Sequence, residues 1–536
     1  MKKRVFSAIL IGAFLIGALA ACQPTAPAAP VTPDAPPVTQ PGVTPPPPPP
    51  PPPPPDDAPL GRGIIVATRD EPPSVAPGHH NAVAGGYFNL MHYNGLFRIC
   101  AETLLPVPDL VEEYWAESDT VFYFRLREGV QFHDGTILNA HDFIRSWEHV
   151  RQFPQGAASR ASIVYFDAVD DMTIRIDTDI PNALFFVDLT HHSNRVMPAH
   201  LIDAGNDFEV NVVGTGPFRF EYWRAGDSIH STVFENYFDQ SRAAHVEYVT
   251  WRVIPEGASR TIAMETGEAH FNVYVAPADV VRMQDHPDVD MMVYPNVGHS
   301  KLLLNNDLPM FADYRVRRAL AMAIDIDAAV LVGTEGLRFA TRANVPTIFP
   351  GFDAYVGQFE FDPQGALALL AEAGVSPSDI TFSMIASNDE RRRMGEVFQA
   401  NFADIGIYVE VEMNDLATTL TRTQQGDYEA GFGGFNSITF LGYVRGVLHS
   451  NQAVPGGSNR SNFRHPDMDD LIDRALLTTD AAARIPLYAE IARIANTYTP
   501  HIPTYMGSNL RAFSANLVVP ELCPSGALNL NMMFWR

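Results

Sequence analysis

An unbroken run of prolines from Pro45 to Pro55 limits where this chain can fold. Proline fixes φ and lacks a backbone N–H, so such a run favours extended polyproline II over helix or sheet. It lies within a segment, residues 23–60, that is mainly Pro, Ala, Thr and Val. At about 3.1 Å per residue the segment would span roughly 100 Å. We expect a disordered stalk over 23–60, or alternatively a ligand for an aromatic-lined groove, and a folded body from about Gly61.

The residues before the stalk have the pattern of a lipoprotein signal. A basic MKKR start is followed by an apolar stretch and then by Leu-Ala-Ala-Cys, which ends at Cys22. This order is typical of secretory signal peptides. The tripeptide before Cys22 resembles the lipobox of bacterial lipoproteins, whose cysteine is lipidated. We therefore predict a signal over 1–22, export to the periplasmic space or cell surface, and a membrane anchor at Cys22; an uncleaved anchor is the alternative.

Length and charge narrow the class of protein. A chain of 536 residues is too long for one ordinary core, so two or three lobes are expected. The chain has 37 basic and 62 acidic residues, a formal net charge of −25. Nucleic acids and anionic membranes are bound through basic side chains, so this balance argues against a nucleic-acid partner. No apolar run after the signal approaches the about 20 residues that span a bilayer.

The body alternates strand and helix patterns. Residues 121–126 read VFYFRL, in which apolar and polar side chains alternate as in a half-buried strand. An Asp-Gly turn follows at 134–135. Asn139, with Asp142 three residues later, predicts the N-cap of a helix that ends near Val150. These patterns indicate a mixed α/β fold.

Two further helices are predicted by apolar stripes. In the first, Asp313 is a candidate cap, and Arg315, Arg317 and Arg318 lie off an apolar face made by Val316, Ala319, Leu320 and Ala323. The second stripe leads into the alternating strand IYVEVEM and consists of Met394, Val397, Phe398 and Phe402.

Four phrases in order resemble the oligopeptide- and dipeptide-binding proteins of ABC importers (solute-binding family 5). They begin LVEEYWAESD, VVGTGPFRF, WRVIPEGAS and FADYRVRRAL, at residues 110, 212, 251 and 311. The resemblance covers roughly residues 61–536. It implies an α/β, two-lobed periplasmic-binding-protein type II fold with an additional domain on the first lobe. Its implied boundaries are lobe I at 61–104, 210–297 and 501–536, the additional domain at 105–209, and lobe II at 298–500.

The resemblance also implies which residues touch ligand. Three stretches of this family face the cleft between the lobes, and here they supply Glu71, Pro73 and Ser74, then Tyr87, then Gly434, Phe435, Asn436, Ser437 and Ile438. In relatives the last stretch commonly carries an aromatic residue that backs the ligand and an aspartate that holds a peptide's α-ammonium. The backbone of that stretch pairs with an extended peptide.

The sequence departs from this pattern at one position. Phe435 keeps the aromatic ring, whereas Ile438 occupies the expected aspartate position. A buried ammonium without a counter-charge is unfavourable by several kcal/mol. Three explanations are open: another acid, such as Glu71 or Asp389, replaces the aspartate; the ligand lacks an α-amine, as a blocked peptide, sugar or metal chelate does; or the alignment is shifted by a few residues.

No catalytic or metal-binding motif is found. GxxxxGK, HExxH and GxSxG are absent from the sequence, and no cofactor is expected. Cys100 and Cys523 either form a disulfide or are two buried thiols.

The predicted function is capture of a solute, first of all a peptide, by a monomeric receptor that closes on a hinge and delivers it to ABC permease subunits. The alternatives are a sensor or scaffold of the same fold, or a receptor for a non-peptide solute.

Overall fold

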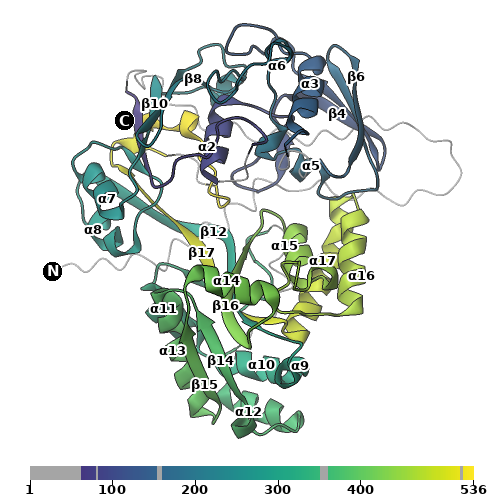
Figure 1. Cartoon of the computed structure of the whole chain (residues 1–536), viewed down its shortest axis with the longest axis vertical. Helices are drawn as coiled ribbons and strands as arrows, with labels where there is room; N and C mark the ends of the chain where they lie inside the picture. Colours follow the sequence, from purple (N-terminus) through teal and green to yellow (C-terminus); the bar gives the residue numbers. More distant parts are fainter. Residues whose placement is uncertain (1–61, 80–82, 154–159, 350–359, 520–522) are drawn as a thin grey trace, which may run out of the picture.

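The structure, a computed structural model, describes residues 62–79, 83–153, 160–349, 360–519 and 523–536. The predicted signal, Cys22 and the proline stalk lie outside these ranges. The described chain is mixed α/β, and it forms two lobes (Figure 1). We call these the upper lobe, which holds β1 and β8–β11, and the lower lobe, which holds β13–β16.

Most of the strands belong to one sheet that runs through both lobes. In the described residues it has 11 strands, ordered β15-β14-β16-β12-β17-β11-β1-β10-β9-β8, with β13 also on β17. The upper-lobe strands are β1 (Ile64–Thr68), β8 (Phe218–Arg224), β9 (Ser228–Val233), β10 (Tyr248–Val253) and β11 (Phe271–Asn272). The lower-lobe strands are β13 (Phe339–Ala340), β14 (Thr381–Ala386), β15 (Tyr408–Met413) and β16 (Ala430–Asn436).

Two long strands connect the lobes. These are β12 (Val289–Leu304) and β17 (His501–Ser514), which pair antiparallel along most of their length. Residues 289–295 of β12 pair with 508–514 in the upper lobe, and residues 299–303 pair with 501–506 in the lower lobe. The register shifts between Pro295 and His299. The predicted boundary at 297/298 therefore falls inside β12, and the boundary at 500/501 falls at the first residue of β17. The domain division as a whole stays a prediction.

Helices cover both faces of the lower-lobe strands. They are α9 (Pro309–Ala312), α10 (Tyr314–Met322), α11 (Ile326–Thr334), α12 (Pro363–Glu372), α13 (Asp389–Asp404), α14 (Leu416–Gln425), α15 (Phe440–Leu448), α16 (Pro466–Leu477) and α17 (Ala481–Tyr498). The upper lobe carries α2 (Val83–His92), α7 (Gly257–Glu265) and α8 (Val280–Gln284). Each lobe buries its own hydrophobic cluster. Within the described residues, none of the helices is both long and apolar enough to cross a bilayer.

A smaller four-stranded sheet stands on the upper lobe (Figure 1). Its order is β4-β5-β7-β6, and its elements are β4 (Val111–Ser118), β5 (Val121–Leu126), β6 (Ile163–Asp170), β7 (Thr173–Thr178), α3 (Ala140–Val150), α5 (Phe185–Asp188) and α6 (Ala199–Asp203). The short pair β2 (Phe97–Ile99) and β3 (Pro106–Pro108) precedes it. The sheet packs on α3 and α5 around a separate aromatic core.

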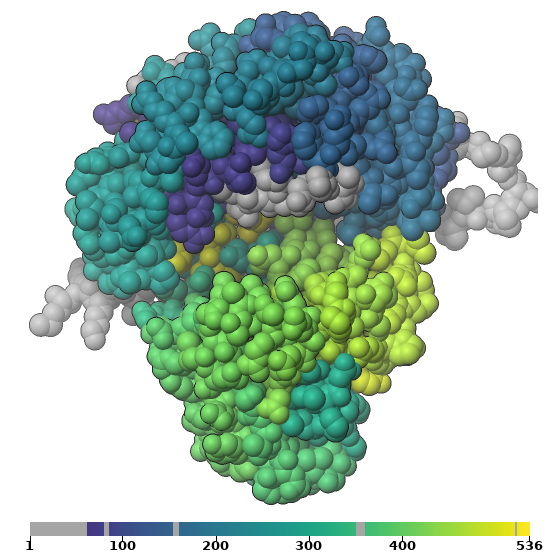
Figure 2. All heavy atoms as spheres, in the orientation of Figure 1, coloured from purple at the N-terminus to yellow at the C-terminus, as the bar shows by residue number. Residues whose placement is uncertain are grey.

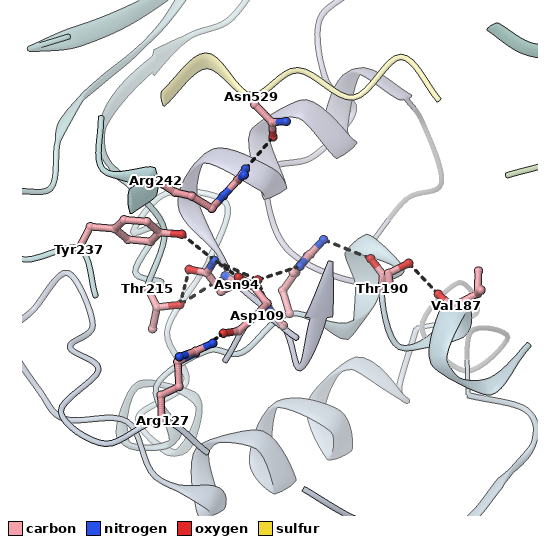
Figure 3. A network of polar contacts seen from close by, with 11 residues as sticks. Asn94, Asp109, Arg127, Val187, Thr190, Thr215, Tyr237, Arg242 and Asn529 are labelled. Carbon is pink, nitrogen blue, oxygen red and sulfur yellow. Dashed lines mark hydrogen bonds and ion pairs between the residues drawn. The ribbon is translucent and has the colours of Figure 1, made fainter. Parts of the chain in front are cut away.

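A buried polar network ties this sheet to the upper lobe (Figure 3). The side-chain amide of Asn94 donates to the carboxylate of Asp109 at 3.0 Å and to the hydroxyl of Tyr237 at 3.2 Å. Thr215 donates to the Asn94 carbonyl oxygen at 3.1 Å. Arg195 is buried 3.9 Å from Asp109. Buried polar networks of this kind favour one relative position of the parts they join.

Several local predictions are confirmed. The strand at 121–126 buries its alternate residues, and α3 begins at a capping box in which Asn139 accepts from the helix backbone and Asp142 accepts from the Asn139 N–H at 2.9 Å. Gly135 has φ +88°, as its turn requires. Both apolar stripes face the lower-lobe core, with Val397 partly buried.

One arginine that was placed off the apolar face is nevertheless buried. Arg317 is 4% exposed. Its guanidinium donates to four backbone carbonyls at the ends of α9 and α17, those of Phe311, Ala312, Tyr498 and Thr499, at 2.6–3.0 Å. A helix C-terminus leaves carbonyls without intrahelical partners, and a planar five-donor group can satisfy several at once. The apolar periodicity could not reveal this, because α17 lies some 180 residues later.

We predict that Arg317→Lys destabilises the protein by about 3 kcal/mol, because one ammonium cannot reach carbonyls on two sides. Urea denaturation followed by circular dichroism measures the change. Arg318→Lys is the matched control, because the Arg318 side chain is next in sequence and exposed. It should change the free energy of unfolding by less than about 0.5 kcal/mol. Equal effects of the two substitutions would contradict the assignment.

Candidate functional site

The surface is hollowed between the upper and lower lobes (Figure 2). At the lobe junction the side chain of Asn296 accepts from the Gly298 N–H at 2.8 Å. A Cβ on Gly507 would lie 2.4 Å from the Asn296 side-chain oxygen, so a larger residue there would displace the Asn296 side chain. Asn436, the last residue of β16, pairs with Gly298. The end of β16 therefore meets β12 at the place where β12 crosses between the lobes.

The predicted turn after β16 starts the next helix. Gly434 and Asn436 are exposed, and Ser437 is half-buried. The Ser437 hydroxyl donates to the carbonyl of Thr439 at 2.8 Å, and Thr439 caps α15 by accepting from the Gly442 N–H at 3.0 Å. Part of the predicted binding stretch thus holds α15 against the sheet, and Gly434 and Asn436 remain open to solvent.

Phe435 and Ile438 pack against an apolar cluster that draws on both lobes. We call it the interlobe cluster; its buried members include Leu104 and Cys523 from the upper side and Phe440, Val444 and Ile472 from the lower side. Phe435 also meets Tyr443 edge-on at 6.0 Å, and a Cβ on Gly446 would lie 2.5 Å from its ring. The assignment of Ile438 to the aspartate position of relatives stays a prediction; a carboxylate in this apolar contact would be desolvated.

Glu71 and Ser74 are engaged within the upper lobe. The Glu71 carboxylate accepts from the indole N–H of Trp223 and from the Gly226 N–H, the latter at 2.9 Å. The Ser74 hydroxyl donates to Glu209, which also accepts from the Val75 N–H at 3.2 Å. Both groups therefore already have internal partners, and Glu71 is a poor replacement for the missing aspartate.

Pro73 is exposed, whereas Tyr87 is buried and stacks on Trp251 at 5.6 Å between ring centroids. Burial raises the pKa of the Tyr87 hydroxyl far above its usual value. Among the described residues no hydrogen bond or ring contact joins this upper-lobe group to the stretch 434–438. The two groups are thus separate surfaces, and their roles in binding stay a prediction. Asp389, the other acid considered, is exposed and pairs with Arg392 at 3.2 Å.

The possible disulfide is not formed, because neither Cys100 nor Cys523 is bonded to another cysteine. Cys523 is buried in the interlobe cluster, where its sulfur lies 2.9 Å from the Ser525 hydroxyl oxygen. The cysteine count allowed a bridge, but only the packing decides whether the two side chains meet. In the described part of the chain, no group of three His, Cys, Asp or Glu side chains is arranged to hold a metal.

The sequence patterns did not reveal a buried series of hydrogen bonds beneath the turn, which joins Lys301, Tyr443 and His299. Lys301 of β12 is 2% exposed, and its ammonium donates to the Tyr443 hydroxyl at 2.9 Å. Tyr443 lies 2.8 Å from Nδ1 of His299, whose Nε2 lies 3.0 Å from the Ala343 carbonyl oxygen. The carbonyl can only accept, so His299 carries its proton on Nε2 and Tyr443 donates to Nδ1. Burial and the charge of Lys301 lower the pKa of His299 to about 3, so the imidazole is neutral.

The signal for this series of hydrogen bonds was the alternation in GHSKLLL. A period of two puts His299, Lys301 and Leu303 on one face of a strand whose residues 300–304 are all buried. Gly433 pairs with Lys301, so no side chain competes for space on that face. The identity of the helix above, α15, could not be read from this pattern.

We predict that Tyr443→Phe lowers the free energy of unfolding by about 2 kcal/mol, because it leaves two buried groups, Lys301 Nζ and His299 Nδ1, without a partner. Thermal and urea denaturation measure the effect. Tyr408→Phe, on the exposed side of β15, is the control and should be neutral. A neutral Tyr443→Phe would mean that the series of hydrogen bonds does not contribute to stability.

Comparisons with known proteins agree on one family. The profile of bacterial extracellular solute-binding proteins, family 5 (middle), matches residues 106–443. The dipeptide-binding protein of Escherichia coli K12 is 26% identical over 443 residues, which cover 76% of this chain and 82% of that protein. The glutathione-binding protein GsiB of Pectobacterium atrosepticum is 27% identical over 421 residues, covering 74% and 79%.

A solved structure, that of HbpA2 from Haemophilus parasuis, has the same fold. Its TM-score is 0.80 at 22% identity, and the alignment covers 89% of this chain and all of that chain. The two-lobed α/β architecture is thereby shown. The family profile spans more than half of the chain, and this protein therefore belongs to family 5 of the bacterial extracellular solute-binding proteins, which serve ABC importers.

Proposed function

We propose that this protein is a lipid-anchored, monomeric receptor that captures a small solute, first of all a peptide, between its lobes and delivers it to the permease subunits of an ABC importer. The anchor at Cys22 and the stalk over 23–60 would hold the receptor near the membrane and give it reach. The observation that carries the peptide assignment is an open strand edge at the end of β16.

The open edge lies on the side of β16 away from β12. Pairing with β12 continues from Ala430 to Asn436, whereas pairing with β14 involves only Ala430 and Gly431. Among the described residues, the segment 432–436 therefore has no strand partner on its β14 side. An unpaired edge offers N–H and C=O groups to an extended peptide, which adds as a further strand. Gly434 and Asn436 are exposed along this edge, so a peptide backbone can approach closely.

The position of this edge fits capture by hinge closure. Asn436 pairs with Gly298 at the junction of the lobes, where the β12–β17 register shifts. Closure about a few strand residues moves lobes as bodies and leaves their cores intact. A solute on the β16 edge would then be enclosed from above. The binding of dipeptides and of glutathione by relatives supports a solute of this size.

Ile438 limits which peptides fit. Because it packs in the interlobe cluster, the turn supplies no carboxylate for a free α-ammonium. This favours a solute whose amine is blocked or absent, and it keeps a non-peptide solute, such as a sugar or a metal chelate, as the second candidate.

Native mass spectrometry on the full chain, extracted from its own membrane in detergent, tests the proposal. A released and fragmented molecule of peptide size supports it. A non-peptide molecule would favour the second candidate. The receptor function fails if no solute is released and if adding cell extract to the protein does not raise its melting temperature.

We predict that Gly434→Val weakens binding of the released solute at least tenfold, about 1.4 kcal/mol, because a branched side chain next to the open edge would hinder the close approach of the solute. The fold should tolerate the change, since a Cβ at Gly434 meets only the His299 carbonyl oxygen at 3.6 Å. Calorimetric titration measures the affinity. Ala417→Val, at an exposed position of α14 in the same lobe, should leave it unchanged. Unchanged affinity in Gly434→Val would exclude the edge as the binding surface.

A further inference from the structure

A narrow pocket lies beneath the end of β16. Its lining includes Lys301, Arg460, Gly434, Phe435, Ser461 and His501, and we call it the cationic pocket. Gly434 is its exposed residue, and Lys301 and His501 are almost completely buried. The pocket thus connects the open strand edge with a buried ammonium group.

The positive charges of this pocket have no acidic partner. Among the described residues, no carboxylate lies within ion-pair distance of Lys301 or Arg460. Arg460 donates to the Thr423 hydroxyl at 3.4 Å, and Lys301 donates to the Tyr443 hydroxyl. Arg391, which acts electrostatically on Arg460, donates to the Ser387 hydroxyl at 2.6 Å and also lacks an acid. Buried basic groups are normally paired with an acid, so the fully buried Lys301, with the half-buried Arg460 and Arg391 near it, is exceptional.

Two neutral groups in the same lining also lack partners. Ser461 Oγ and His501 Nε2 are buried and, within the described residues, make no hydrogen bond. Buried polar atoms are nearly always satisfied, and those that are not call for an explanation. A guest with acceptor oxygens would satisfy the Ser461 hydroxyl and lie beside the two cations.

Burial and the nearby Arg460 charge lower the pKa of Lys301 well below its ordinary value. The shift has this direction because nothing negative offsets the desolvated ammonium. An anionic group at this place would favour the charged form again. The pocket is therefore electrostatically complementary to an anion and repels an ammonium or a metal cation.

We propose that the solute carries a carboxylate, and that this carboxylate enters the cationic pocket past Gly434 and binds between Lys301 and Arg460. The inference rests on the proposed receptor function and names the class of its solute: acidic peptides or other organic acids. It gives the uncharged turn a physical reason. In this protein Lys301 and Arg460 would bind a negative group of the solute. In relatives, by the resemblance, an aspartate at the position assigned to Ile438 binds a positive group.

Matched probes test this on the full-length protein. Two pairs of blocked tripeptides differ by one charge: acetyl-Ala-Glu-Ala-amide against acetyl-Ala-Gln-Ala-amide, and acetyl-Ala-Ala-Ala against its amide. Calorimetric titration should give at least tenfold tighter binding for the acidic member of one pair.

Variants assign the preference to the pocket. Lys301→Met and Arg460→Gln should each reduce the acid preference at least tenfold and leave binding of the amide unchanged. Arg318→Gln, an exposed cation of the same lobe, should not alter the preference. Because Arg460 is only half-buried, its variant tests the pocket even if Lys301→Met fails to fold.

The outcomes separate the two proposals. Equal binding of acid and amide overturns the carboxylate assignment and leaves the receptor function intact. If neither pair binds but native mass spectrometry releases another solute, the charge of that solute decides. If it is an acid and binds more weakly to both variants, the assignment is supported. If it is neutral or cationic, the assignment is overturned. If no probe binds and no solute is released, the receptor function itself fails.

Discussion

The antiparallel pair of β12 and β17 is the interaction on which the rest of the structure depends. It is the continuous ladder between the lobes, and its register shift near Asn296 lies where the chain crosses from one to the other. Each strand contributes one half to the upper-lobe sheet and one half to the lower-lobe sheet. The ladder holds two cores in one molecule, and the proposed hinge closure would require it to bend at a few residues.

The candidate site follows from the same strand. Because β12 alternates its side chains, the segment that leaves the hinge places Lys301 beneath α15 and presents its backbone to β16. Gly433 of β16 pairs with Lys301 and adds no side chain there, and within the described residues β16 has no strand partner on its β14 side beyond Gly431. Ile438 joins the interlobe cluster instead of facing a ligand as an acid. The proposed backbone recognition at the edge and the proposed charge recognition below it would thus involve neighbouring parts of one short segment.

Much of the local structure was predictable from the residues. The Asn139 cap, the Gly135 turn and the buried stripe through Phe398 depend on contacts within a few positions, where periodicity and capping chemistry act directly. Of the candidate site, the sequence supplied the stretch 434–438 through its resemblance to a family. It did not supply the internal partners of Glu71 and Ser74, because Trp223 and Glu209 approach from segments more than 130 residues away.

By itself the sequence determined a mixed α/β body, a family and a turn without an acid. These follow from patterns that are local or that a family shares. Only the tertiary structure decided that Arg317 is a buried cap and that, among the residues described, Lys301 has no carboxylate within ion-pair distance. Whether a charge is paired depends on which distant segments fold around it. Long-range packing, which leaves no period in the sequence, therefore fixed the electrostatics of the site.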